Sequence, residues 1–166
     1  MDRVTQPLRD EHAGLRPQVD ALREIADLAE QLSPNELVAR LAAATAFLHR
    51  HLLVHAHVEE VALYPVVEWA IGGTGATATM ARDHAEIARL VRQFDDVRSV
   101  VGRGPVRPEE LRRLRQVLYG LHAVIVVHFA KEEEIYLPLL DERLSPDAAA
   151  RMFENMEEEA AKKAAA

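Results

Sequence analysis

The sequence contains no cysteine among its 166 residues. This absence excludes disulfides, iron–sulfur clusters, thiolate zinc sites and thiol catalysis, and it is typical of a reducing compartment. The most apolar stretch, Ala123–Val127, is far shorter than the roughly 20 residues that a membrane-spanning helix needs. The segment Met1–Pro7 lacks the apolar part of a secretory signal. We therefore expect a cytoplasmic protein without contact to a membrane.

The chain also has fewer basic than acidic residues. Lys and Arg together number 20 against 27 Asp and Glu, which gives a formal net charge of −7. Nucleic-acid binding depends on neutralising phosphates with a basic surface, so this balance argues against a nucleic-acid partner. Hydrophobic residues make up 49% of the chain, enough to bury a core in a single domain of this length.

Helical periodicity dominates the stretches between the Pro and Gly residues, and no strand pattern competes with it. We predict four long amphipathic helices at about residues 8–32, 34–71, 78–101 and 108–144, and a short fifth helix after Ser145-Pro146. Ser33-Pro34-Asn35-Glu36 is a capping box with Pro at the first helical position, a strong start signal. The sequence thus predicts an all-α fold, with an antiparallel up-down-up-down four-helix bundle over residues 1–144. Residues 145–166 are expected to form the short C-terminal helix and a frayed tail.

Two of the predicted helices carry the same motif, 73 residues apart. Each has a His, a Glu four residues later and a Pro six residues after that Glu: His55, Glu59 and Pro65 in one, and His128, Glu132 and Pro138 in the other. Side chains four apart lie one above the other on a helix, so an imidazole and a carboxylate can reach one metal ion. Both pairs fall on the apolar face, where a buried Glu is costly unless it is paired or coordinated.

His12 and His84 lie on the inward faces of the first and third predicted helices. Four helices would then bring four imidazoles and two carboxylates to one level of the bundle. Nitrogen and oxygen ligands without thiolate suit iron or manganese, and zinc less specifically. Two shared carboxylates are the usual means of holding two ions about 3–4 Å apart.

Four further residues have two readings each. His51 and Tyr136 lie on the same faces as the ligands, and each is either an additional ligand or a peripheral or packing group. Glu60 and Glu133 follow the two motif carboxylates and point aside. They either accept hydrogen bonds from coordinating imidazoles or lie on the surface.

This arrangement of two single histidines and two His-x-x-x-Glu pairs on four helices resembles the hemerythrin-like (HHE cation-binding) family, over about His12 to Leu140. The resemblance implies an antiparallel four-helix bundle with a non-haem di-iron centre, two iron ions joined by an oxo or hydroxo bridge. It also implies terminal ligands at His12, His55, His84 and His128, and bridging carboxylates at Glu59 and Glu132.

The sequence departs from oxygen-carrying hemerythrins on the third helix, where the residue four after His84 is Ala88 and not a second histidine. Four histidines instead of five leave two coordination positions open, which favours reaction with small oxidants over simple oxygen carriage. We therefore expect a di-iron oxidoreductase with catalase-like disproportionation of hydrogen peroxide. The alternatives are reversible binding of O₂ or NO without turnover, and a metal-free helical interaction module. A ferritin-like fold is rejected, since no Glu has a His three residues later.

Overall fold

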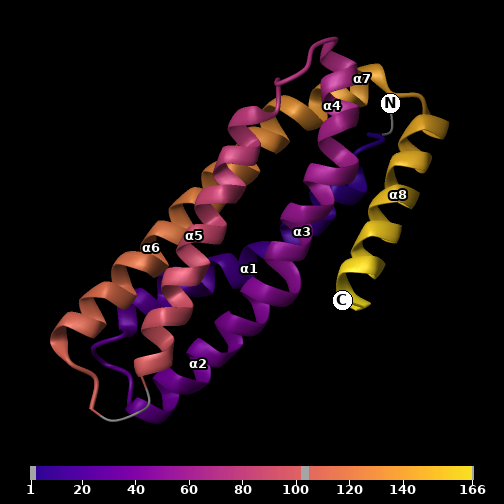
Figure 1. Cartoon of the computed structure of the whole chain (residues 1–166). Helices are drawn as coiled ribbons and strands as arrows, with labels where there is room; N and C mark the ends of the chain where they lie inside the picture. Colours follow the sequence, from indigo (N-terminus) through magenta and orange to yellow (C-terminus); the bar gives the residue numbers. More distant parts are fainter. Residues whose placement is uncertain (1–2, 102–104, 166) are drawn as a thin grey trace.

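The computed structural model describes residues 3–101 and 105–165, and it is helical throughout apart from turns and short connections. Figure 1 shows long helical rods lying side by side, with the last helix against one flank of the bundle. Single helices form the first and third rods, α1 (Gln6–Leu28) and α5 (Ala78–Val100). The predicted all-α class is confirmed over the described residues.

The second rod runs without a break from Pro34 to Ile71. It consists of α2 (Pro34–Phe47), η1 (Leu48–Leu52), α3 (Leu53–Val58), η2 (Glu59–Leu63) and α4 (Tyr64–Ile71), the η elements being π-helical turns. The predicted capping box is present, since Ser33 Oγ accepts a hydrogen bond from the Glu36 N–H and Glu36 Oε2 accepts one from the Ser33 N–H. The rod ends at Gly72, whose φ of 79° favours glycine.

The fourth rod is built in the same way, from α6 (Pro108–Lys131), η3 (Glu132–Tyr136) and α7 (Leu137–Arg143). The motif carboxylates Glu59 and Glu132 are the first residues of η2 and η3. In each turn the carbonyl of that Glu accepts a hydrogen bond from the N–H five residues later. Pro65 and Pro138 follow directly after these bonds; because a proline ring clashes with the carbonyl four residues earlier, a wider turn relieves the contact.

The buried apolar side chains form two clusters, one toward each end of the rods. The first includes Leu22, Leu41, Leu48, Phe94 and Phe129, and the second includes Leu8, Leu63, Met80, Leu140 and Met152. On every rod the predicted ligands lie between residues of the first cluster and residues of the second. The fold therefore places a polar layer between two apolar layers.

The C-terminal helix α8 (Pro146–Ala165) has 20 residues and packs on α3 and η2. It is longer than the short helix predicted, and it continues through the stretch expected to fray. Three buried residues, Ala149, Met152 and Met156, recur at helical spacing and attach it to the bundle.

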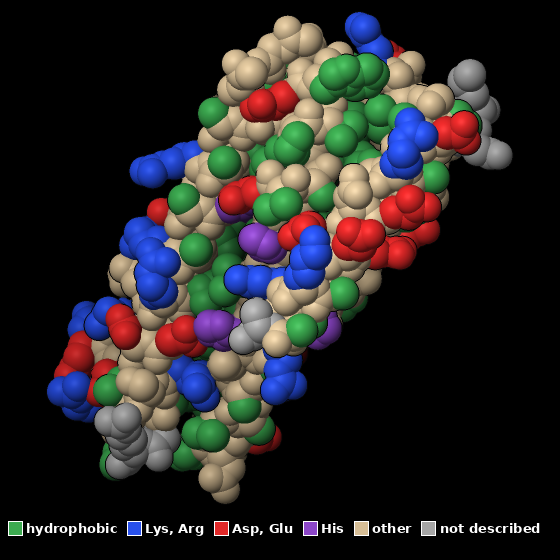
Figure 2. Space-filling model, turned by 45° about the vertical axis from the view of Figure 1, so that its right-hand side comes forward, with side chains coloured by type: hydrophobic (Ala, Val, Ile, Leu, Met, Phe, Trp, Pro, Cys, Tyr) green, Lys and Arg blue, Asp and Glu red, His purple; other side chains and the backbone are tan. Residues whose placement is uncertain are grey.

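One helical run among the described residues, Pro34–Ile71, is long and apolar enough to cross a membrane by length and composition. The same run is the second rod of the bundle and carries the fully buried carboxylate of Glu59. A core helix of a globular protein passes the same test, so the absence of membrane contact stays a prediction. Figure 2 shows acidic and basic side chains interspersed over the face that carries α8.

Candidate metal centre

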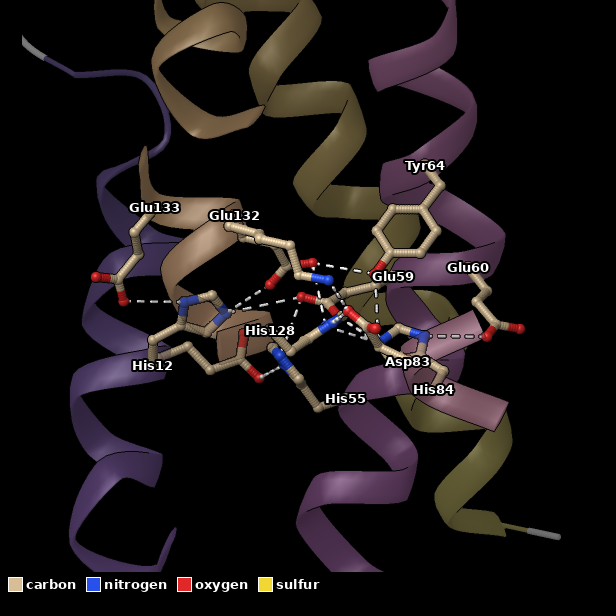
Figure 3. Close-up of polar contacts among 12 residues, drawn as sticks. His12, His55, Glu59, Glu60, Tyr64, Asp83, His84, His128, Glu132 and Glu133 are labelled. Carbon is tan, nitrogen blue, oxygen red and sulfur yellow. Dashed lines mark hydrogen bonds and ion pairs between the residues drawn. The ribbon is translucent and has the colours of Figure 1, made fainter. Parts of the chain in front are cut away.

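The structure brings all six predicted ligands together in the polar layer, and none of them is more than 6% exposed. Figure 3 shows their side chains converging from the four rods. They are His12 on α1, His55 and Glu59 on the second rod, His84 on α5, and His128 and Glu132 on the fourth rod.

Glu59 faces histidines on both sides. Its Oε1 lies 3.0 Å from Nε2 of His55 and 3.7 Å from Nε2 of His12. Its Oε2 lies 3.3 Å from Nε2 of His84 and 3.7 Å from Nε2 of His128. The two oxygens of this carboxylate are thus directed at two different pairs of imidazoles.

Glu132 has the same divided arrangement. Its Oε2 lies 3.3 Å from Nε2 of His12, and its Oε1 lies 3.4 Å from Nε2 of His128. Both carboxylates therefore lie between the same two halves of the site. A carboxylate that turns one oxygen toward each half is suited to bridge two metal ions.

Five nitrogen and oxygen atoms at this point are buried without a hydrogen-bond partner: His12 Nε2, His55 Nε2, Glu59 Oε1, Glu59 Oε2 and Glu132 Oε2. Burying such an atom without a hydrogen bond costs about 1–3 kcal/mol, and more for a charged group. All five converge on one place, and their lone pairs are of the kind that metal ions accept. The arrangement therefore suits a metal site and is difficult to explain as ordinary packing.

The outward nitrogens of His12 and His84 bond to the carboxylates expected to support them. Nδ1 of His12 lies 3.2 Å from Oε1 of Glu133, and Nδ1 of His84 lies 3.0 Å from Oε1 of Glu60. Donation of the Nδ1 proton to a carboxylate fixes the tautomer and leaves Nε2 free to coordinate. Of the two readings left open for Glu60 and Glu133, the structure selects hydrogen bonding to imidazoles.

The other two histidines have equivalent partners that the sequence analysis missed. Nδ1 of His55 lies 3.0 Å from Oε1 of Glu11, and Nδ1 of His128 lies 3.2 Å from Oδ2 of Asp83. Glu11 directly precedes His12, and Asp83 directly precedes His84. An acidic residue beside each single histidine was a signal available in the sequence, although the helix that it would contact was not.

These four contacts follow one rule around the bundle. An acidic residue next to a predicted ligand on one rod bonds to the predicted histidine ligand of the following rod. The acidic residue of the fourth rod bonds to the histidine of the first rod. Two of the four carboxylates also face a cation, since Lys131 contacts Asp83 and Arg16 lies 3.8 Å from Glu133. Glu11 and Glu60 are almost half exposed and form no ion pair with a Lys or Arg of the described residues.

Tyr64 is a further member of the site that the sequence analysis missed. Its hydroxyl donates a hydrogen bond to Oε1 of Glu132 at 3.0 Å and lies 3.3 Å from Nε2 of His84. In a regular α-helix a residue five positions after Glu59 points away from the face of Glu59. Because the intervening turn η2 is π-helical, it contains an additional residue and returns Tyr64 to the site.

The two residues considered as additional ligands do not reach the centre. The Tyr136 hydroxyl donates to the carbonyl of Ala76 at 3.2 Å, and His51 is exposed on η1. The π turn η3 also changes the direction of Tyr136, which lies at its last position. Packing with a bonded hydroxyl was the alternative reading of Tyr136, and the structure supports it.

The histidines and carboxylates of the site shift one another's pKa values. Burial by itself favours the neutral imidazole, but the carboxylates of Glu132 and Glu59 outweigh it and raise the pKa of His12 to about 9. Burial also opposes the charged forms of His55 and Glu59, yet their mutual attraction raises the pKa of His55 and lowers that of Glu59. Burial and the nearby carboxylates raise the pKa of the Tyr64 hydroxyl, which keeps it protonated.

The fold and the site define a class: a helical protein whose buried histidines and carboxylates, drawn from four rods, suit a di-iron site. The sequence profile of the hemerythrin HHE cation-binding domain matches residues 3–140 and, in a second overlapping match, residues 78–166. The chain belongs to this family, as its motifs predicted. Searches of curated proteins and of solved structures gave no match.

Proposed function

We propose that this chain is a non-haem di-iron protein that reacts with small oxidants, and that it disproportionates hydrogen peroxide to water and dioxygen. The proposal takes the four rods in up-down-up-down order and the two iron ions as joined by an oxo or hydroxo bridge. The observation that carries it is the convergence of buried imidazole and carboxylate atoms that have no hydrogen-bond partner, from His12, His55, Glu59 and Glu132.

In this proposal His12 and His55 hold one ion, His84 and His128 hold the other, and Glu59 and Glu132 bridge them. The pair of irons supplies a two-electron couple between its ferric and ferrous states. The chain keeps the four imidazole rings of the site in fixed orientations, since a carboxylate bonds to the Nδ1 of each one. Ligands held in this way need little rearrangement when the charge at the centre changes.

The proposed preference for turnover over oxygen carriage rests on Ala88 and Tyr64. Ala88 stands where oxygen-carrying hemerythrins have a fifth histidine, so the half of the site that contains His84 has one histidine fewer than in those proteins. The Tyr64 hydroxyl lies in the same half of the site, 3.3 Å from Nε2 of His84. A protonated phenol at this position can donate a hydrogen bond to a bound oxidant and assist transfer of a proton.

The apolar surroundings support the same proposal by limiting the access of water. Phe129 is 2% exposed and stacks on the His12 ring at 4.2 Å between centroids with an interplanar angle of 5°. Apolar layers above and below the polar layer lower the local dielectric constant, which strengthens the electrostatic interactions of the site.

Oxygen evolution tests the proposal directly. Hydrogen peroxide is added to the iron-loaded protein in an oxygen electrode, beside His128→Ala and the control His49→Ala, which alters an exposed histidine paired with Asp95. We expect sustained O₂ release from the wild type and the control, and none from His128→Ala. A wild type that contains two irons per chain but releases no O₂ would contradict the peroxide reaction.

The second candidate is reversible binding of O₂ or NO without turnover, and the two coordination positions that four histidines leave open favour it equally. It predicts a stable adduct with its own absorption spectrum, formed on addition of the gas and reversed by its removal. Small oxidants are the only partners proposed in either case.

A further inference from the structure

A cleft of about 340 Å³ lies between α1, α8 and the stretch of the second rod that includes η1 and α3. His55 and Glu11 form part of its wall. Because His55 is a predicted metal ligand and Glu11 holds its Nδ1, an occupant of the cleft would lie directly beside the candidate centre.

The body of the cleft is apolar. Leu8, Leu15, Val58 and Met156 are buried in its wall, and Phe153 contributes an aromatic ring from α8. Its volume is within the range of cavities that hold small organic ligands. The apolar wall selects for a ligand that carries a hydrocarbon or aromatic part.

Charge is distributed unevenly around the cleft. Arg50 and His51 are adjacent and exposed on the η1 side, and neither side chain forms a hydrogen bond or ion pair with the described residues. Glu157 lies on the opposite wall, on α8, while Glu11 is already engaged with His55. An unpaired guanidinium at the edge of an apolar cleft is complementary to a carboxylate at the end of an apolar chain.

We propose that this cleft binds a small amphipathic carboxylate, with its apolar part between α1 and α8 and its anionic end on Arg50. The proposal assigns a role to α8, which provides one wall of the cleft. It does not depend on the iron chemistry, because none of the groups that would hold the carboxylate is a predicted metal ligand.

Isothermal titration calorimetry on the full chain tests this site, with sodium decanoate as the probe below its micelle concentration. Two analogues keep the chain length and change the polar end: 1-decanol is neutral and decyltrimethylammonium is cationic. We expect saturable binding of one decanoate per chain and much weaker binding of both analogues. If decanol binds as tightly as decanoate, the cleft does not recognise the anionic end. If the cation binds more strongly than decanoate, Glu157 sets the charge preference. Either result would overturn the proposal.

Two variants locate the binding. Arg50→Gln should weaken decanoate about fivefold, the loss expected for a partly exposed ion pair. Ala160→Trp places an indole in the cleft and should abolish binding. Arg92→Gln is the matched control, because Arg92 is an exposed arginine on α5 outside the cleft. Circular dichroism melting checks that each variant is folded, and decanoate binding that is unchanged in both Arg50→Gln and Ala160→Trp overturns the site.

Discussion

Glu11 on α1 and His55 on α3 are 44 residues apart, yet Nδ1 of His55 lies 3.0 Å from Oε1 of Glu11. His55 is buried, whereas the Glu11 side chain is 46% exposed, so the contact runs from the candidate metal centre to the surface. It is one of four such contacts, and together they tie each rod to the next at the level of the predicted ligands.

Loss of this carboxylate should weaken metal binding. We expect Glu11→Ala to lower the affinity for iron about 10- to 100-fold, because the His55 ring loses the acceptor that orients it. Glu11→Gln should be milder, since an amide oxygen still accepts the Nδ1 proton. Competition with a chromophoric chelator measures the affinity. Glu24→Ala is the control, an exposed acid of the same helix, and equal effects of Glu11→Ala and Glu24→Ala would refute the role of Glu11.

Removal of metal should lower stability. A ligand present at a thousand times its Kd stabilises the folded state by about 4 kcal/mol, which for a chain of this size corresponds to a shift in Tm of about 10 °C. We therefore expect a drop of about this size when a chelator is added, measured by differential scanning calorimetry. A Tm that does not respond to chelation, together with a His55→Ala variant at least as stable as the wild type, would support the metal-free interaction module.

The metal-free chain should lose stability as the pH rises. The pKa of His12 is about 9 in the folded state against an ordinary value of 6.5. Its protonation therefore stabilises the fold fully below about pH 6.5, and this contribution disappears as the pH rises through 9. The change is of the order of 3 kcal/mol. Urea unfolding between pH 6 and pH 9.5 measures it, and His12→Gln should flatten the profile. Stability that stays constant or increases over this range would contradict the assignment.

The Tyr64 hydroxyl should matter for turnover and not for the presence of metal. Tyr64→Phe removes the donor to Glu132 while keeping the ring, so we expect about a 10- to 100-fold slower release of O₂ at full iron content. Tyr136→Phe is the matched control, because its hydroxyl bonds to the carbonyl of Ala76. A Tyr64→Phe variant with full iron and undiminished turnover would remove the phenol from the proposed reaction.

The sequence by itself determined the helices and the six ligand positions that the structure brings together. Helical periodicity, the capping box at Ser33–Glu36 and the stop at Gly72 depend on interactions within a few residues, which is why they can be read locally. The paired motifs His55/Glu59 and His128/Glu132 were equally readable, because spacing along one helix determines which side chains share a face.

Only the tertiary structure decided which rods contact each other and through which residues. Glu11 and Asp83 act on imidazoles of neighbouring rods, and the order and rotation of packed helices depend on the whole core. The same holds for Tyr64, which a regular helix would have turned away from the site. The π turn that begins at Glu59 rotates Tyr64 inward, and an assumed α-helical period cannot foresee that rotation. Local spacing therefore gave the candidate ligands, while the packing and the irregular turns gave the groups that surround them.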